Sequence, residues 1–307
     1  MVESENKPAP MKCPKIGLGT CNIIEIEDIV YQSIKDGTRL IDTASRYRNE
    51  EQIGKGIKKA LEENIVKRED LFVVTKCWVN EKSDPETALK NSLKKLQLDY
   101  VDLYLDHWPC GKYYGDDEKK KFEFVSIRDL WPKMENLVKK GLTKYIGVSN
   151  YNVQNILLIL SICNIKPAVN EVEFNPYLYQ KDLKEFCDKE DIKIFSYNPL
   201  VKGDYCKKEK HQKAIKERNL DLLNEEIIQN LAKTYGKTAG QIILNWHIHL
   251  GVIPIPGTTN PNRMKENLEA DTFTMKDEEY NSIGSLCEKK EYRFCDSIDL
   301  YGIDIFA

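Results

Sequence analysis

Short apolar runs alternate along the chain with longer segments in which apolar residues recur every three or four positions. A short apolar run bounded by polar residues is typical of a buried strand, whereas the longer spacing is typical of an amphipathic helix. The expected strands are 15–20, 40–44, 71–76, 102–108, 144–149, 168–174, 193–199 and 252–256. This alternation predicts an α/β fold built on a parallel sheet.

Two helix starts are marked by a capping residue followed by proline, at Asp84-Pro85 and Asn260-Pro261. The side chain of the first residue can accept from free backbone N–H groups, and proline suits the first helical position. The expected helices are 24–36, one from 49, 85–96, 130–140, 224–235, 239–250 and one from 261.

Eight strand–helix repeats favour a closed (β/α)8 barrel, known as a TIM barrel, and we expect a single domain over residues 1–307. The long insertions 109–128 and 200–219 and the tail 288–307 are expected to rim the C-terminal mouth of the barrel. An open doubly wound sheet is the alternative, and it favours GxGxxG after the first strand. Here Gly17 and Gly19 match the first two glycines, but Thr20, Cys21 and Asn22 follow and the third glycine is missing, which weakens that alternative.

The composition narrows the class of protein. The net charge of −3 gives no global field that would attract nucleic acid or an anionic membrane, and the lysine-rich segment 202–216 is local. Nine cysteines without a CxxC pair fit a reduced protein better than a disulfide scaffold. The first residues lack a signal-peptide pattern, and no apolar run approaches a membrane span. We therefore expect a cytoplasmic protein, and the sequence leaves a monomer and a homodimer open as alternatives.

Polar side chains that can do chemistry lie within, at the end of or just after the expected strands, and the C-terminal strand ends are where active sites of barrels lie. They are Asp42, Tyr47, Lys76, His107, Ser149, Asn150, Glu171 and Tyr197. A free phenol has a pKa of about 10, and a nearby ammonium lowers that value by favouring the phenolate. A carboxylate keeps the ammonium charged, and a histidine can orient a carbonyl. These residue types suit protonation of an oxygen while another group delivers hydride.

Several segments in order along nearly the whole chain resemble the aldo-keto reductase superfamily. The resemblance is carried by GLGT (17–20), IDTASRYRNE (41–50), VVTKCW (73–78), DYVDLYLDHWP (99–109), IGVSN (146–150), AVNEVEFNPYL (168–178) and IPGTTNPNRMKENL (255–268). Within the superfamily the chain looks most like aldose and xylose reductases and the plant mannose or sorbitol 6-phosphate reductases. The tail 292–307 is similar to their closing segments.

The resemblance implies NAD(P)H-dependent reduction of an aldehyde or ketone, such as an aldose or sugar phosphate, without a metal. It makes Tyr47 the acid, Lys76 and Asp42 the pair that tunes it, and His107 the group that orients the carbonyl. The positions implied to bind the cofactor are Ser149, Asn150, Glu171, Tyr197, Asn198, Leu200, Thr258, Arg263 and Asn267. The positions implied to form the substrate pocket are Cys21, Arg46, Arg48, Trp78 and Trp108.

Two departures from the family pattern concern the cofactor. Glu171 stands where the family usually has glutamine, and a carboxylate cannot donate to the nicotinamide carboxamide. Gly257 and Thr258 replace the Lys-Ser pair that commonly binds the 2′-phosphate of NADPH, while Arg263 and a helix N-terminus remain. The expected cofactor is NADPH with relaxed preference, and a dual NADPH/NADH enzyme stays open.

A third departure concerns the substrate. Cys21 stands where many relatives carry tryptophan, which predicts a wider and less aromatic pocket. Plant sugar-phosphate reductases resemble this chain in carrying a basic residue after the tyrosine. Arg48, with Arg46, is therefore a candidate for binding a substrate phosphate, and a solvated arginine near Glu50 and Glu51 is the alternative.

Other functions remain as alternatives. Some relatives with this fold hold nucleotide as regulatory or sensor subunits with little turnover, so a binding protein is the second hypothesis. His247-Ile248-His249 spells the HxH of barrel metallohydrolases, but it lies in an expected helix, where positions i and i+2 point apart. The lysine-rich segment 202–216 is expected to be a solvated surface or to cover the cofactor pyrophosphate.

Overall fold

The computed structural model describes residues 11–114, 121–202, 205–297 and 305–306. Within these ranges eight parallel strands form one sheet in the order β1-β2-β3-β4-β7-β8-β9-β10. The strands are β1 (Leu18–Gly19), β2 (Leu40–Asp42), β3 (Phe72–Cys77), β4 (Val101–Asp106), β7 (Thr143–Ser149), β8 (Val169–Glu173), β9 (Lys193–Tyr197) and β10 (Ile253–Pro254).

Backbone hydrogen bonds join the two ends of this sheet. Gly17 N donates to Pro254 O at 3.0 Å, and Gly19 N donates to Pro256 O at 3.1 Å. The absence of a side chain at Gly19 permits this approach, since a Cβ there would lie 2.5 Å from Ile255 O. The sheet is thus closed, and the predicted (β/α)8 barrel is confirmed.

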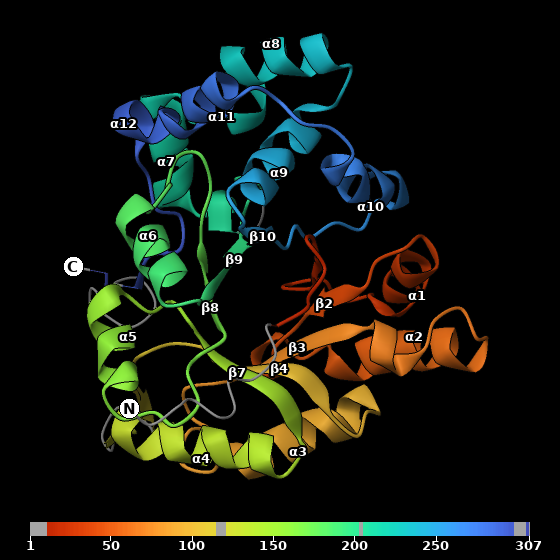
Figure 1. Ribbon diagram of the computed structural model, residues 1–307, viewed down its shortest axis with the longest axis vertical. Helices are drawn as coiled ribbons and strands as arrows, with labels where there is room; N and C mark the ends of the chain where they lie inside the picture. The colour runs from red at the N-terminus through yellow and green to blue at the C-terminus, as the bar shows by residue number, and fades with distance from the viewer. Residues whose placement is uncertain (1–10, 115–120, 203–204, 298–304, 307) are drawn as a thin grey trace, which may run out of the picture.

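Helices surround the strands on the outside of the barrel (Figure 1). They are α1 (Glu27–Lys35), α2 (Glu50–Glu62), α3 (Pro85–Leu96), α4 (Ile127–Lys139), α5 (Val153–Leu160), α6 (Lys181–Lys189), α7 (Glu209–Arg218), α8 (Glu226–Tyr235), α9 (Ala239–His249), α10 (Pro261–Leu268), α11 (Asp277–Gly284) and α12 (Leu286–Lys290). Both predicted Asx-Pro starts are confirmed, because Asp84 accepts from Thr87 N and Asn260 accepts from Asn262 N.

The strands separate two apolar cores. Alternate positions such as Leu40, Val74 and Leu105 point into the barrel, whereas their neighbours Ile41 and Val73 pack against the helices. Because both faces of the sheet are buried, the strands read in the sequence as continuous apolar runs rather than as alternating patterns.

Some predicted elements differ from the observed ones. Strands β1 and β10 are shorter than predicted, and helices α5, α6, α7, α11 and α12 were not predicted. The insertion after β4, predicted as a loop, contains the antiparallel hairpin of β5 (Lys112–Tyr114) and β6 (Lys121–Glu123). Residues 115–120 and 203–204 of the two insertions, and residues 298–304 and 307 of the tail, lie outside the described residues.

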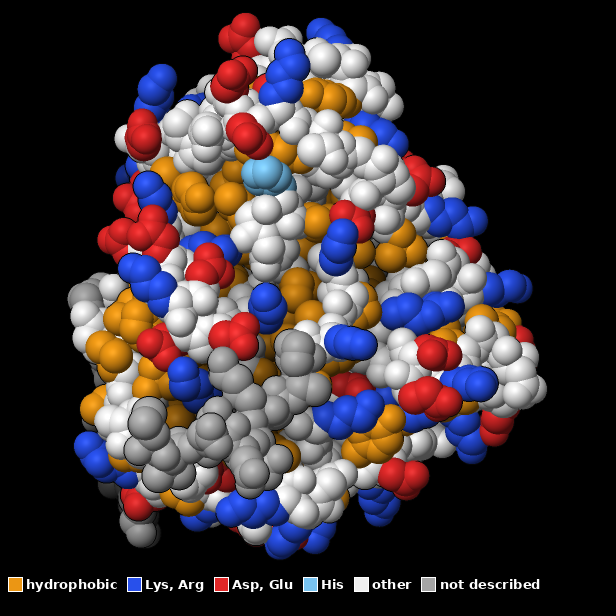
Figure 2. Space-filling view, viewed as in Figure 1, with side chains coloured by type: hydrophobic (Ala, Val, Ile, Leu, Met, Phe, Trp, Pro, Cys, Tyr) orange, Lys and Arg blue, Asp and Glu red, His pale blue; other side chains and the backbone are white. Residues whose placement is uncertain are grey.

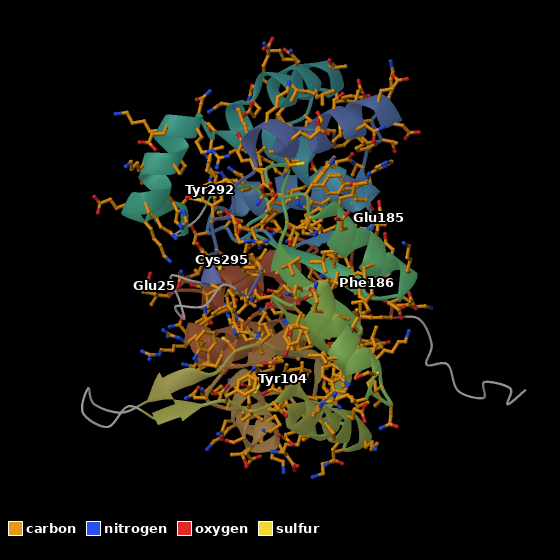
Figure 3. All side chains as sticks on the ribbon, turned by 90° about the vertical axis from the view of Figure 1, so that its left-hand side faces the viewer. Glu25, Tyr104, Glu185, Phe186, Tyr292 and Cys295 are labelled. Atoms are coloured by element: carbon orange, nitrogen blue, oxygen red, sulfur yellow. The ribbon has the colours of Figure 1, made fainter. Side chains whose placement is uncertain are left out.

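The insertions and the described part of the tail lie at the predicted mouth. Figure 3 shows hairpin β5–β6 and helix α7 projecting on the side where Cys295 and Glu25 lie, whereas Glu185 and Phe186 lie on the opposite side. Over the face shown in Figure 2, Lys and Arg side chains are interspersed with Asp and Glu. Among the described residues, no helix has the length and apolar character needed to cross a membrane.

Candidate active site

The candidate catalytic side chains continue the inward-pointing rows of the barrel core. Side chains along a strand alternate between its two faces, so every second residue points inward. Leu40 is followed at this spacing by Asp42, Val74 by Lys76, and Leu105 by His107. Glu171 follows Val169 and Tyr197 follows Phe195 in the same way. The site is therefore the topmost layer of the barrel interior, where polar residues replace apolar ones.

Lys76 is the centre of this layer and is fully buried. Its ammonium donates to both carboxylate oxygens of Asp42 at 2.7 Å and to the backbone oxygen of Thr43 at 3.0 Å. Glu171 Oε1 lies 3.2 Å from the same nitrogen. Although burial opposes it, the charge of Asp42, together with the hydrogen bonds to Asp42 and Glu171, raises the pKa of Lys76 and keeps it an ammonium.

Tyr47 lies in the short helix η1 (Ser45–Tyr47) that follows β2. Its phenol oxygen is 3.5 Å from Lys76 Nζ, and its ring meets His107 edge-on with centroids 5.8 Å apart. The predicted tetrad of Asp42, Tyr47, Lys76 and His107 is thus brought together at one place, with the phenol between a cation and an imidazole.

His107 follows the last residue of β4, and two backbone hydrogen bonds fix it. Its N–H donates to Cys77 O at 3.1 Å, and its carbonyl accepts from the amide of Asn150 at 3.0 Å. Burial, followed by the charges of Lys76, Lys82 and Arg46, holds the pKa of His107 well below its ordinary value. The imidazole is therefore neutral at physiological pH.

A second group of predicted residues is linked by hydrogen bonds on the other side of Lys76. Ser149 Oγ donates to the backbone oxygen of Glu171 at 2.8 Å, and the Asn150 amide donates to Ser149 Oγ at 3.1 Å. Tyr197 OH donates to Asn150 Oδ1 at 2.7 Å. The Glu171 oxygen Oε2 is buried and has no hydrogen-bond partner among the described residues.

A cavity of about 730 Å³ runs over these side chains and on to helix α10. Most predicted site residues line it, namely Cys21, Asp42, Tyr47, His107, Trp108, Ser149, Asn150, Glu171, Tyr197, Asn198, Leu200, Thr258, Arg263 and Asn267. The cavity is long enough to include residues after β1, β9 and β10, and so it joins the tetrad to the N-terminal turn of α10.

Three predicted pocket residues lie outside the set that lines this cavity. Trp78 stands beside the site, edge-on to His107 with ring centroids 5.0 Å apart. The exposed guanidinium of Arg46 lies over the Trp78 ring, 5.5 Å from its centroid. Arg48 is also exposed, and its backbone has a φ of 60° that turns the chain toward α2.

A buried polar cluster behind His107 was missed by sequence reasoning. Asp106 Oδ2 accepts from Lys82 Nζ at 2.9 Å and from Tyr151 OH at 2.6 Å, and Lys82 also donates to Trp108 O. The signal in the sequence was the aspartate that ends β4, directly after Leu103, Tyr104 and Leu105. The cluster holds the segment that carries His107 and Trp108.

Glu173 is a second missed residue, and it joins the barrel to the tail. Its Oε2 accepts from the backbone N–H groups of Phe294 at 2.9 Å and Cys295 at 2.8 Å. Its Oε1 accepts from the Asn198 amide at 2.9 Å. Cys295 packs in turn with Trp108 and Phe306 at the cavity.

The cavity ends at the first turn of α10, where Asn260 Oδ1 caps the backbone N–H groups of Asn262 and Arg263. Exposed N–H groups and the helix dipole favour an anion at such a turn, and Arg263 adds a positive charge. Lys202 and Lys207, from the lysine-rich segment, line the cavity as well.

The two histidines of the HxH motif are placed apart from this site. His247 is buried in α9 with its ring nitrogens 2.8 Å and 2.9 Å from the backbone oxygens of Ile243 and Phe174. His249 stacks on Tyr280 with ring centroids 3.6 Å apart. Within the described ranges, no three His, Cys, Asp or Glu residues are grouped in a way that could hold a metal ion.

Comparisons with known proteins agree with this geometry. Residues 15–288 match the model of the aldo/keto reductase family. The chain is 37% identical to aldose reductase B of Dictyostelium discoideum, covering 95% of this chain and 94% of that protein. It is 34% identical to the NADH-dependent D-xylose reductase of Candida parapsilosis, covering 96% and 94%.

A solved structure gives the same result. The aldo-keto reductase of Bombyx mori in complex with NADP is 33% identical, with a TM-score of 0.81, and the match covers 94% of this chain and 92% of that one. The chain therefore belongs to the aldo/keto reductase family of NAD(P)H-dependent oxidoreductases.

Proposed function

We propose that this chain, acting as a single barrel domain, reduces the carbonyl group of a small aldose or aldehyde to the alcohol. In this proposal NADPH is the hydride donor and Tyr47 is the proton donor. The observation that carries it is the buried Lys76 ammonium, which lies 2.7 Å from Asp42 and 3.5 Å from the Tyr47 oxygen beside an open cavity.

The residues along the cavity fit a nicotinamide dinucleotide. At the barrel end, the Glu171 oxygen Oε2, which has no hydrogen-bond partner among the described residues, would hold the carboxamide, with Asn150 and Ser149 beside it and Tyr197 against the ring. At the other end, α10 and Arg263 would hold the 2′-phosphate. The Bombyx mori relative is in complex with NADP, whereas the Candida parapsilosis enzyme is named for NADH, which supports NADPH with some use of NADH.

When bound in this cavity, a reduced nicotinamide would provide the hydride for reduction of the carbonyl carbon. Lys76 stabilises the negative charge that Tyr47 develops when its phenolic proton moves to the carbonyl oxygen, and Asp42 keeps Lys76 charged. His107 is neutral, so its imidazole can donate an N–H hydrogen bond that orients the carbonyl without competing as an acid. Trp78 and Tyr47 hold the imidazole ring between them.

The substrate end of the cavity is formed by Cys21, Trp108 and Cys295. These side chains are uncharged, which favours a neutral carbonyl compound. Arg48 is exposed, so a substrate phosphate would have to extend out of the cavity to reach it. We therefore place plain aldoses and aldehydes before sugar phosphates.

The test follows loss of reduced-nicotinamide absorbance with NADPH and with NADH. The substrates are a generic aldehyde, xylose and glucose 6-phosphate. Tyr47→Phe should lower turnover by about 100-fold or more, because a positioned general acid contributes at least that factor. NADPH affinity should stay within about twofold, and Tyr31→Phe, which alters a phenol bonded to Glu63 on the outer surface, should leave turnover unchanged.

Retention of full turnover by Tyr47→Phe would contradict the assignment of the acid. A protein that binds NADPH but reduces none of these carbonyls would favour the alternative of a regulatory or sensor barrel. If the protein preferred glucose 6-phosphate over xylose and Arg48→Ala lost that preference, the substrate would be a sugar phosphate.

A further inference from the structure

The Lys76 ammonium has fewer hydrogen-bond donors than there are acceptor atoms within its reach. Its ammonium carries three N–H donors. The two carboxylate oxygens of Asp42, both at 2.7 Å, and the backbone oxygen of Thr43, at 3.0 Å, can take all three of them. Glu171 at 3.2 Å and the Tyr47 oxygen at 3.5 Å compete for the same donors.

The charges are unbalanced in the same way. Asp42, Lys76 and Glu171 have side chains that are 3%, 0% and 2% exposed, so water does not screen them. One ammonium faces two carboxyl groups, and if both were ionised the buried group would carry a net negative charge. Such a charge is costly in a dry interior, and a proton on one carboxyl group removes it.

Of the two carboxyl groups, Glu171 makes the weaker contact with Lys76. Asp42 meets the ammonium with both oxygens, whereas Glu171 meets it with one, and its Oε2 is unpartnered among the described residues. Burial, followed by the charge of Asp42, raises the pKa of Glu171 well above its ordinary value. Burial raises the pKa of Asp42 as well, against the lowering effect of Lys76.

The charged groups around Glu171 come from strands that lie across the barrel from β8. The charged ones are Asp42 from β2 and Lys76 from β3. The other titratable side chains that line this end of the cavity are Tyr47, Tyr197 and the neutral His107. None of these three carries a full positive charge at neutral pH that could hold Glu171 ionised.

We propose that Glu171 holds a proton at neutral pH and donates it in a hydrogen bond to the carboxamide oxygen of the nicotinamide, so that loss of this proton weakens cofactor binding. This inference rests on the cofactor site proposed above. A protonated carboxyl group offers one donor and one acceptor, which matches the two faces of a carboxamide. An ionised Glu171 offers acceptors alone, and it also competes more strongly with Tyr47 for the Lys76 donors.

The test measures the dissociation constant of NADPH without carbonyl substrate, by quenching of protein tryptophan fluorescence, from pH 6 to pH 9.5. We compare the wild type with Glu171→Gln, which has the same shape and does not titrate. Above the pKa of Glu171, wild-type affinity should fall by about tenfold per pH unit, because one proton is taken up on binding. The affinity of Glu171→Gln should change little over the same range, and NADH, which lacks the 2′-phosphate, should show the same contrast.

Calorimetry in buffers with different ionisation enthalpies supplies a second readout. The wild type should take up a proton on binding NADPH at high pH, and the variant should not. Parallel pH profiles for the two proteins, or equal proton uptake, would overturn the proposal. Absence of NADPH binding by either protein at any pH would overturn the proposed function and this inference with it.

A measurement without nucleotide keeps the proposal testable if the variant binds poorly. A carboxyl group whose folded-state pKa is raised above its unfolded value of about 4.5 gives stability that is complete below that value. This stability is lost as pH rises through the folded-state pKa. The wild type should therefore lose urea resistance relative to Glu171→Gln as pH rises, and an unchanged difference would count against a bound proton.

Discussion

Arg263 adds a positive charge to the first turn of α10 at the edge of the cavity. A charge-assisted hydrogen bond to a phosphate contributes about 1.5–3 kcal/mol, which corresponds to roughly 10- to 100-fold in affinity. Arg263→Ala should therefore weaken NADPH binding by about 10-fold or more and leave NADH binding within about twofold. Fluorescence titration with both nucleotides measures this.

Lys265→Ala is the matched control for that measurement. Lys265 lies on the same helix but pairs with Asp36 at 3.4 Å. The substitution therefore removes one positive charge from a position outside the cavity. Its two dissociation constants should resemble those of the wild type. An equal loss of NADPH and NADH affinity in Arg263→Ala would show that the arginine supports the helix rather than a 2′-phosphate.

At the level of single residues, Asp42, Lys76 and His107 could be predicted because each lies at or next to the end of an apolar run, and Tyr47 because it lies in the turn five residues after Asp42. The close approach of Glu171 to Lys76 could not, since it depends on how far β8 and β3 lie apart across a closed barrel. The exposure of Arg46 and Arg48 was also not predictable. It depends on the turn after Tyr47, in which Arg48 adopts a left-handed backbone conformation.

Helices α2 and α3 pack closely because Gly54 has no side chain. A Cβ at this position would lie 2.5 Å from Lys95 O and 2.6 Å from the backbone of Leu96. These backbone atoms cannot move aside without shifting α3, so Gly54→Ala should destabilise the protein by about 1–3 kcal/mol. Urea denaturation followed by circular dichroism measures the change.

Gly240 in α9 supplies the comparison for this prediction. The nearest atoms to a Cβ at Gly240 are 3.8 Å and 3.9 Å away, which is ordinary contact. Gly240→Ala should therefore show only the gain in helix propensity, roughly 0.5–1 kcal/mol of added stability. If both substitutions stabilised the protein equally, close packing at Gly54 would be refuted.

At the level of elements, most helices that carry a clear amphipathic pattern or a capping signal could be predicted, but α6, which has such a pattern, was missed. Helix α5 is only 8 residues long and has no clear amphipathic pattern. Its sequence VQNILLIL is apolar on most sides and leaves Leu157 and Leu158 exposed at 50% and 44%. Helix α7 is polar nearly all round and buries His211 alone in its described turns. Periodicity cannot identify such segments, since they are held by contacts that the fold creates.

At the level of the whole molecule, Glu173 connects β8, the segment after β9 and the tail. Glutamine at this position has one oxygen and one NH2 group, so it must face one of its two sets of donor partners with a donor. Glu173→Gln should lower stability by about 1–3 kcal/mol and release the tail around Cys295. Urea denaturation and limited proteolysis with mapping of the cleavage sites measure both effects.

Glu185→Gln, on the exposed side of α6, is the control, since Glu185 lies on the opposite side of the molecule from Cys295 (Figure 3). It should resemble the wild type in both assays. Unchanged stability and unchanged cleavage near Phe294 in Glu173→Gln would show that the tail is held by its apolar contacts alone.

The contact between Phe306 and the barrel has a practical consequence. The Phe306 ring packs against Trp108 with centroids 6.4 Å apart and lies 3.8 Å from the Arg293 guanidinium. A segment fused after this residue would begin beside Trp108, which lines the cavity. A purification tag placed there would hinder assays of substrate choice, so kinetic work on this chain is better begun from a tag that is cleaved away.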